Sequence, residues 1–171
     1  PTWTQADSYQ RGTGAGANMR LYRNSDASNN QIVEARMRSN VQSFGLILNR
    51  IHANQFYAIQ IGADNVVIYW KDPGYNTIGT AGYTFENDTW YNIKATTIDN
   101  GSNKDIVVYV NGVSVVSAST DHKFGSGSAG LFNYLGAGEN FDTDWFAFDT
   151  APSFTTFSPT SPKVGDTVTA N

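Results

Sequence analysis

The 171-residue chain contains no cysteine, which excludes a disulfide framework and a thiolate metal site. Charged residues are scarce at 15%, and the formal net charge is −4 with a sequence pI near 4.9. Nucleic acids and anionic membranes attract proteins with a broad basic field, so neither partner is expected. No run approaches the roughly 20 apolar residues of a membrane span, and no stretch has the pattern of a signal peptide.

Aromatic residues, by contrast, make up 13% of the chain, and there are 16 glycines. Thr, Val, Tyr and Trp fit pleated strands, whereas Asn and Gly serve turns, so the composition favours strands over helices. The length suits one domain with a sizeable core. The composition also favours a secreted, extracellular protein.

Apolar and polar residues alternate in a series of short segments bounded by Gly, Asn and Asp. The segment 31–38 places Val33, Ala35 and Met37 on one face, and Asn111-Gly112 favours a two-residue turn between two strands. The predicted strands are 31–38, 44–50, 56–61, 66–71, 90–98, 106–110, 113–118, 131–135 and 141–148. Such short strands without a helix predict an all-β fold, a two-sheet antiparallel β-sandwich, with a closed barrel as the alternative.

The amino-acid composition changes near the end of the chain. We assign residues 1–150 to the sandwich, because the segment 151–171 is rich in Pro, Ser and Thr. We interpret 151–171 as a linker that leads into the first strand of a following module. The alternative is a C-terminal tail packed across the sandwich.

Several segments carry a family resemblance through their order and spacing. They are "VEARMR", "GLILNR", "FYAIQI", "TWYNIKA", "IVVYVNG", "SAGLFNY" and "FDTDWFAF". With these segments, residues 3–149 resemble the concanavalin A-like (laminin-G-like) jelly rolls found as carbohydrate-binding modules in secreted bacterial polysaccharide-degrading enzymes. The resemblance implies a jelly-roll fold and favours sugar binding as the function. It does not specify a ligand, because glycosidases, lyases and protein-binding modules share this fold.

Catalytic groups are hard to find in the sequence. Hydrolases of this fold use paired carboxylates, and the pair in this sequence that is most similar is Asp142 and Asp144 in "ENFDTD". Phe146 and Phe148 continue the same strand face into the expected core, which argues against a catalytic pair there. Lyases use a Tyr/His pair, but His52 and His122 lie in polar surroundings without the lyase patterns. We therefore expect no catalytic residue. Asp142 and Asp144 are instead candidate ligands for a structural Ca²⁺, which related modules often hold near their terminal strands.

The remaining candidates are side chains turned away from the core, where a sugar could stack on aromatic rings and meet planar polar groups. The predicted ligand-binding residues are Arg36, Arg38, Asn49, Arg50, Tyr69, Lys71, Tyr75, Tyr109 and Trp145. Arg36 and Arg38 stand within about 7 Å on one strand face. If both arginines face a ligand-binding groove on the outside of the sandwich, an acidic polysaccharide is the preferred ligand. The alternative, equally open, is that they pair with surface carboxylates such as Glu34.

The expected function is that of a carbohydrate-binding module without catalysis. It would be a monomer in solution that attaches a larger secreted protein to a polysaccharide or oligosaccharide through covalently linked neighbouring modules. One alternative is a small polysaccharide lyase or glycoside hydrolase on the same fold. Another is an adhesin or surface-layer interaction domain.

Overall fold

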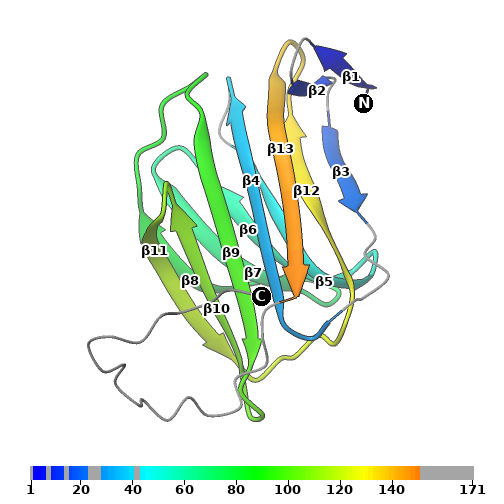
Figure 1. The fold of residues 1–171 in the computed structure, drawn as a ribbon, viewed down its shortest axis with the longest axis vertical. Helices are drawn as coiled ribbons and strands as arrows, with labels where there is room; N and C mark the ends of the chain where they lie inside the picture. The colour runs from blue at the N-terminus through cyan, green and yellow to red at the C-terminus, as the bar shows by residue number, and fades with distance from the viewer. Residues whose placement is uncertain (1, 7–8, 14–15, 23–27, 41–42, 151–171) are drawn as a thin grey trace, which may run out of the picture.

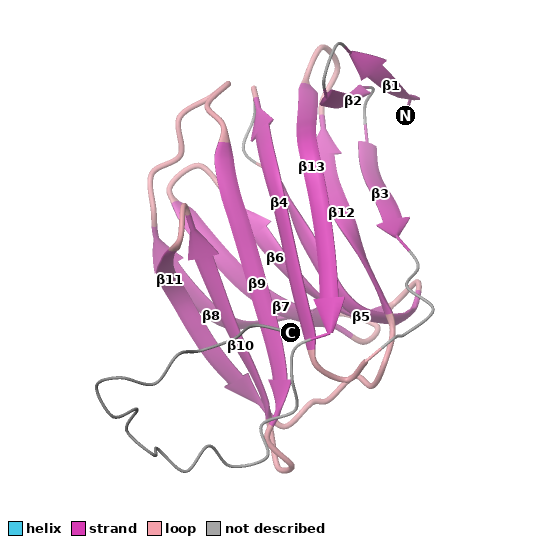
Figure 2. Ribbon diagram, viewed as in Figure 1, coloured by secondary structure: helices cyan, strands magenta, loops and turns pink. Residues whose placement is uncertain are grey.

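The computed structural model describes the chain at residues 2–6, 9–13, 16–22, 28–40 and 43–150. The described residues form thirteen strands and no helix, arranged as two antiparallel sheets (Figure 1 and Figure 2). This confirms the predicted all-β sandwich. No helix in this part of the chain could cross a membrane. The segment interpreted as a linker lies outside the described residues.

One sheet has seven strands in the order β1-β2-β13-β4-β9-β10-β11, and Figure 1 looks onto it. Its strands are β1 (Thr2–Ala6), β2 (Tyr9–Thr13), β4 (Gln31–Ser39), β9 (Tyr91–Asp99), β10 (Lys104–Val110), β11 (Val113–Thr120) and β13 (Asn140–Thr150). The central pair β4 and β13 joins strands far apart in the sequence, as expected of a jelly roll.

The other sheet has six strands in the order β3-β12-β5-β6-β7-β8. Its strands are β3 (Gly16–Tyr22), β5 (Phe44–His52), β6 (Gln55–Ile61), β7 (Asn65–Lys71), β8 (Tyr75–Gly82) and β12 (Ser128–Leu135). Strands β5, β6, β7 and β8 follow one another as an antiparallel meander. The outer face of this sheet is therefore built largely from one continuous stretch of chain.

The core lies between the two sheets. Val33, Ala35 and Met37 of β4 are fully buried there, as the alternation of the sequence predicts. They belong to the same apolar cluster as Leu46 of β5 and Ile59 of β6, which face them from the other sheet. The opposite side chains of every strand are left for the two outer faces.

The sequence pattern did not predict β8 or the first three strands. In β8, "YNTIGTAG" lacks a regular alternation, and Tyr75, which follows Pro73-Gly74, opens the strand. Gly79 has a packing role, because a Cβ atom there would lie 2.9 Å from the Cβ of Ala118 in β11. The missing side chain lets the edge strands of the two sheets approach each other.

A buried phenol links the core to the segment before β12. The Tyr57 hydroxyl donates to the His122 carbonyl (2.7 Å) and accepts from the Phe124 N–H (3.0 Å). Burial raises the pKa of Tyr57 to about 12. Because this exceeds the value of about 10 in an unfolded chain, the associated stabilisation is complete below pH 10 and is lost as the pH rises towards 12.

We therefore expect the thermal unfolding midpoint to fall between pH 10 and 12. Tyr57→Phe should start from a lower midpoint but decline less steeply, since it has one buried phenol fewer to ionise. The measurement is a series of melting curves followed by circular dichroism. Tyr134→Phe is the control, because Tyr134 is 62% exposed and should leave the slope unchanged. Parallel curves for Tyr57→Phe and the wild type would contradict this assignment.

Candidate functional site

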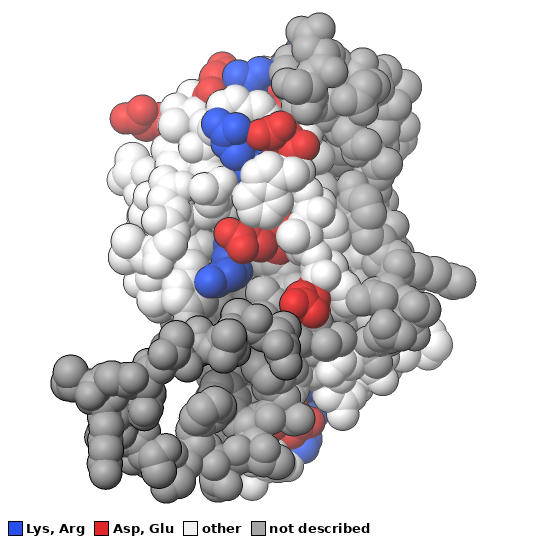
Figure 3. Space-filling view, in the orientation of Figure 1, with Lys and Arg blue, Asp and Glu red and all other residues white. Residues whose placement is uncertain are grey.

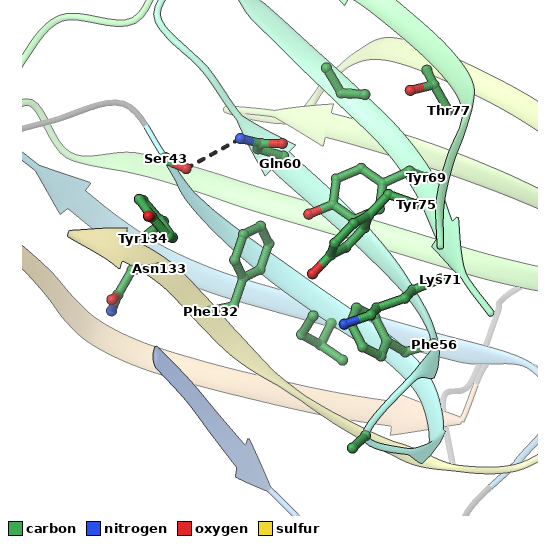
Figure 4. Close-up of a pocket in the computed structure, with 13 residues that line it drawn as sticks. Ser43, Phe56, Gln60, Tyr69, Lys71, Tyr75, Thr77, Phe132, Asn133 and Tyr134 are labelled. Carbon is green, nitrogen blue, oxygen red and sulfur yellow. Dashed lines mark hydrogen bonds between the residues drawn. The ribbon is translucent and has the colours of Figure 1, made fainter. Parts of the chain in front are cut away.

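A cavity of about 730 Å³ lies on the outer face of the six-stranded sheet (Figure 4). Its size is within the range of roughly 300–1,000 Å³ typical of ligand pockets. We call it the trough. It is lined by Ser43, Ile47, Ala53, Phe56, Gln60, Val67, Tyr69, Lys71, Tyr75, Thr77, Phe132, Asn133 and Tyr134.

Strand register brings the lining residues together. Phe56 of β6 pairs with Lys71 of β7, which pairs with Tyr75 of β8. Ala58 of β6 pairs with Tyr69 in the same way, two residues along each strand. Because alternate residues of a strand point to the same face, both rows lie on the outer face, where all of these residues except the buried Ala58 line the trough.

The floor of the trough is apolar and separate from the main core. Ile47, Phe56 and Ala58 form a second buried cluster, against which Tyr69 and Phe132 pack. This cluster gives the outer face a water-excluding surface that an ordinary solvated sheet face would lack.

Strands β5 and β6 approach each other closely at Gly45 of β5. A Cβ atom there would lie 1.7 Å from the Ile59 carbonyl oxygen and 3.0 Å from the Phe132 ring. Glycine is required at this position by contact with the backbone of β6. Phe132, which pairs with Gly45 from β12, therefore lies over a strand that carries no side chain at that point.

Three tyrosines surround the trough. The rings of Tyr69 and Tyr75 meet edge to face with centroids 5.1 Å apart. Tyr75 is 63% exposed, and Tyr134 of β12 is 62% exposed. Exposed rings at a cavity rim can stack on the apolar face of a ligand while their hydroxyls stay hydrated.

The polar groups of the trough are few. Gln60 donates from Nε2 to the Ser43 hydroxyl (3.2 Å), and the Lys71 ammonium lies 4.8 Å from the centre of the Tyr75 ring. Lys71 is the single charged residue of the described lining, which contains no Asp, Glu or His. Such a lining can stack and hydrogen-bond a ligand, but it offers no pair of groups for acid–base chemistry.

The nine predicted binding residues do not share one face. Three line the trough: Tyr69, Lys71 and Tyr75. Four others project from the outer face of the seven-stranded sheet: Arg36, Arg38, Tyr109 and Trp145. These four therefore lie on a different face from Tyr69, because alternation identifies an outward side chain without saying which sheet carries it.

The two arginines of β4 are engaged by carboxylates of β13. Arg36 donates from Nη1 to Asp144 Oδ2 (2.7 Å), and Arg38 from Nε to Asp142 Oδ2 (2.9 Å). Both guanidinium groups also lie over the Trp90 ring, at 5.1 and 4.8 Å from its centre. Figure 3, which looks onto this face, shows blue and red side chains side by side. Both arginines are thus paired with carboxylates, as in the open alternative, although Asp142 is buried and only Asp144 is partly exposed.

Asp142 is fully buried beneath a second arginine. Arg11 donates from Nε to Oδ1 (2.7 Å) and from Nη2 to Oδ2 (2.8 Å) of this carboxylate. Guanidinium groups thus occupy the oxygens that a Ca²⁺ ion would need, and Asp144 is likewise paired. No cluster of three or more potential metal-ligating side chains occurs among the described residues. Asp142 and Asp144 therefore do not fit the ligand set of calcium.

Asn49 is also not in the trough. It is fully buried at a positive φ of 48°, at an irregularity in the pairing of β5 with β6. Its amide nitrogen donates to the carbonyls of Ser28 (3.3 Å), Asn29 (3.1 Å) and Gly125 (3.0 Å), and its Oδ1 accepts from the Thr97 hydroxyl (2.8 Å). Asn49 therefore connects the loops at residues 28–29 and at Gly125 to β5 through hydrogen bonds.

Arg50 follows Asn49 and is likewise absent from the lining of the trough. Its backbone contacts the chain at Gly127, where a Cβ atom would lie 2.6 Å from the Arg50 carbonyl. Both residues were predicted for the groove because they end a strand, a position that says nothing about burial.

Sequence reasoning missed the trough residues of β6 and β12. Phe56 and Gln60 alternate with the buried Tyr57 and Ile59, so their outward direction was readable from the pattern. Phe132 had no comparable signal. Its place beside Gly45 depends on a pairing between strands more than 80 residues apart in the chain.

Comparison with known proteins identifies the architecture. No family model and no curated protein matches the sequence. A mutant of the GH43 protein BlXynB from Bacillus licheniformis superposes with a TM-score of 0.61 at 13% identity, covering 88% of this chain and 35% of that one. The VIP36 exoplasmic/lumenal domain, in a Ca²⁺/Man3GlcNAc-bound form, has a TM-score of 0.54 at 9% identity, covering 90% and 83%.

A functionally unknown protein from Saccharomyces cerevisiae superposes with a TM-score of 0.60 at 9% identity, covering 89% of this chain and 93% of the other. This chain thus spans about a third of the length of BlXynB. At such low identities the likeness concerns fold alone. The chain is a jelly-roll β-sandwich, of the architecture shared by the BlXynB and VIP36 structures.

Proposed function

We propose that the chain is a non-catalytic carbohydrate-binding module that holds a glycan in the trough. The observation that carries this proposal is the apolar floor around Phe56, bordered by the exposed rings of Tyr75 and Tyr134. Aromatic rings stack on the apolar faces of pyranose rings, and side chains such as Gln60 can bond their hydroxyls. The fold shared with the Man3GlcNAc-bound VIP36 domain supports a sugar ligand.

The lining supports binding without turnover. Glycoside hydrolysis needs two carboxyl groups roughly 5–9.5 Å apart across the scissile bond, and the described lining contains none. The histidines that a lyase would need, His52 and His122, are not among the lining residues either.

The biological role would be attachment. A single trough of this kind gives micromolar or weaker affinity, and a covalent neighbour gains from the raised local concentration of its polymer. The match to about a third of BlXynB supports a place in a longer protein, and the composition favours a secreted one. The module would act as a monomer, since one trough suffices for attachment.

Tyr75→Ala should weaken retention on the bound polysaccharide roughly tenfold, because it removes an exposed stacking ring. The unfolding midpoint should stay within about 2 °C, as expected for an exposed site. Affinity electrophoresis through glucans, alginate, pectin and sulfated galactans measures retention. Trp145→Ala is the matched control, because Trp145 is a 38% exposed aromatic residue on the other sheet.

Equal losses from Tyr75→Ala and Trp145→Ala would show that the trough is not the binding site. The same polymers should release neither reducing ends nor unsaturated products when incubated with the wild type. Turnover of any of them would contradict the non-catalytic role.

A further inference from the structure

Among the residues that the structure describes, no carboxylate forms an ion pair with the ammonium group of Lys71. Arg36, Arg38 and Lys123 all form ion pairs with carboxylates, whereas Lys71 forms none with any described residue. Its Nζ lies 4.8 Å from the centre of the Tyr75 ring and 5.8 Å from that of Phe56. These rings hold the charge at the cavity wall without neutralising it.

Two phenol groups lie beside this charge. Tyr69 and Tyr75 line the trough next to Lys71, and Figure 4 shows all three side chains on the same side of the cavity. Neither hydroxyl makes a hydrogen bond to a described residue. Burial raises the pKa of Tyr69 far above the physiological range, with the neighbouring Tyr75 adding to the effect, so this phenol remains a donor at neutral pH.

One cation and two hydroxyl donors therefore meet in a cavity whose described lining carries no negative charge. An anionic oxygen group would gain charge-assisted hydrogen bonds there, which are about twice as strong as neutral ones. A neutral sugar would leave the ammonium without a partner of opposite charge. This local charge contrasts with the formal net charge of −4 of the whole chain.

We infer, on the basis of the proposed function, that the trough prefers a glycan with an anionic substituent and that Lys71 recognises that substituent. The shared chemistry is a carboxylate or sulfate oxygen on a sugar ring. Arg36 and Arg38, the residues expected to recognise an acidic chain, are occupied by Asp144 and Asp142 on the other sheet. The anionic substituent is recognised instead by one lysine of β7, Lys71.

The test compares each acidic polymer with its neutral counterpart. Polygalacturonate is paired with its fully methyl-esterified form, and a sulfated galactan with its desulfated form, so that the two arms separate carboxylate from sulfate. The wild type should be retained about tenfold more strongly by one acidic polymer than by its neutral partner at low salt. Added salt should reduce this preference.

Lys71→Gln should remove the preference, and Lys71→Arg should preserve it. The matched control is Lys94→Gln, because Lys94 Nζ lies 4.6 Å from the centre of the Tyr109 ring on the seven-stranded sheet and repeats the lysine–tyrosine contact outside the trough. Lys94→Gln should retain the wild-type preference. Melting curves establish that each variant is folded.

Equal retention of acidic and neutral polymers by the wild type would overturn this inference, as would an unchanged preference in Lys71→Gln. In either case, a loss of retention on Tyr75→Ala would leave the proposed function standing. If no polymer of the panel retains the wild type, the proposed function and this inference are both overturned.

Discussion

Replacing Asn49 with alanine is expected to lower the free energy of unfolding by about 3 to 4 kcal/mol. The substitution removes the donor for three loop carbonyls and the acceptor for the buried Thr97 hydroxyl. Each buried polar group left without a partner costs about 1–3 kcal/mol. The backbone adds to the loss, because φ of 48° suits asparagine better than alanine.

Chemical denaturation of Asn49→Ala and of Asn76→Ala measures this difference. Asn76 is an exposed asparagine of β8 whose amide makes one long hydrogen bond to the Gly74 carbonyl (3.4 Å), so its loss should change stability by about 0.5 kcal/mol or less. An Asn49→Ala protein of normal stability that no longer bound polysaccharide would restore Asn49 to the ligand site and refute its structural role.

Asp142→Ala is expected to cost about 3 kcal/mol of unfolding free energy. The buried carboxylate is the shared partner of Arg11 and Arg38, and both would face each other without a negative charge between them. Asp144→Ala is the internal control. Its pair with Arg36 is partly exposed on both sides, so that change should cost about 1 kcal/mol or less.

The same variants separate an arginine-bound carboxylate from a calcium site. The wild-type unfolding midpoint should not change on addition of EDTA or Ca²⁺, since guanidinium groups already neutralise Asp142. A fall of the midpoint in EDTA, absent from Asp142→Ala, would contradict this and indicate a metal at these carboxylates.

The sequence was sufficient for the architecture because the strands of the core alternate regularly. In β4, for example, period-two alternation predicted both the strand and the burial of Val33, Ala35 and Met37. The same pattern failed for β8, whose exposed positions and glycines leave no apolar stripe. Strand prediction therefore succeeded where apolar residues alternate and failed at β8, where they do not, whereas the other edge strand, β11, was predicted from its valines and the preceding Asn111-Gly112 turn.

The candidate site was less accessible to sequence reasoning. Tyr69, Lys71 and Arg36 all read as outward residues, but only the strand order separates β7 from β4 into different sheets. The burial of Asn49 depends on Thr97, which lies 48 residues away along the chain. Such relations come from long-range pairing and packing, which no local periodicity encodes.

The contact between Gly45 and the Ile59 carbonyl limits how this surface could be redesigned. No side chain can be added beneath Phe132, since a Cβ atom at Gly45 would meet the main chain of β6. The rim residues Tyr75 and Thr77 of β8 and Tyr134 of β12 are free of this constraint and are the positions at which selectivity could be changed. Variants that change these rim residues and keep Gly45 should retain the fold.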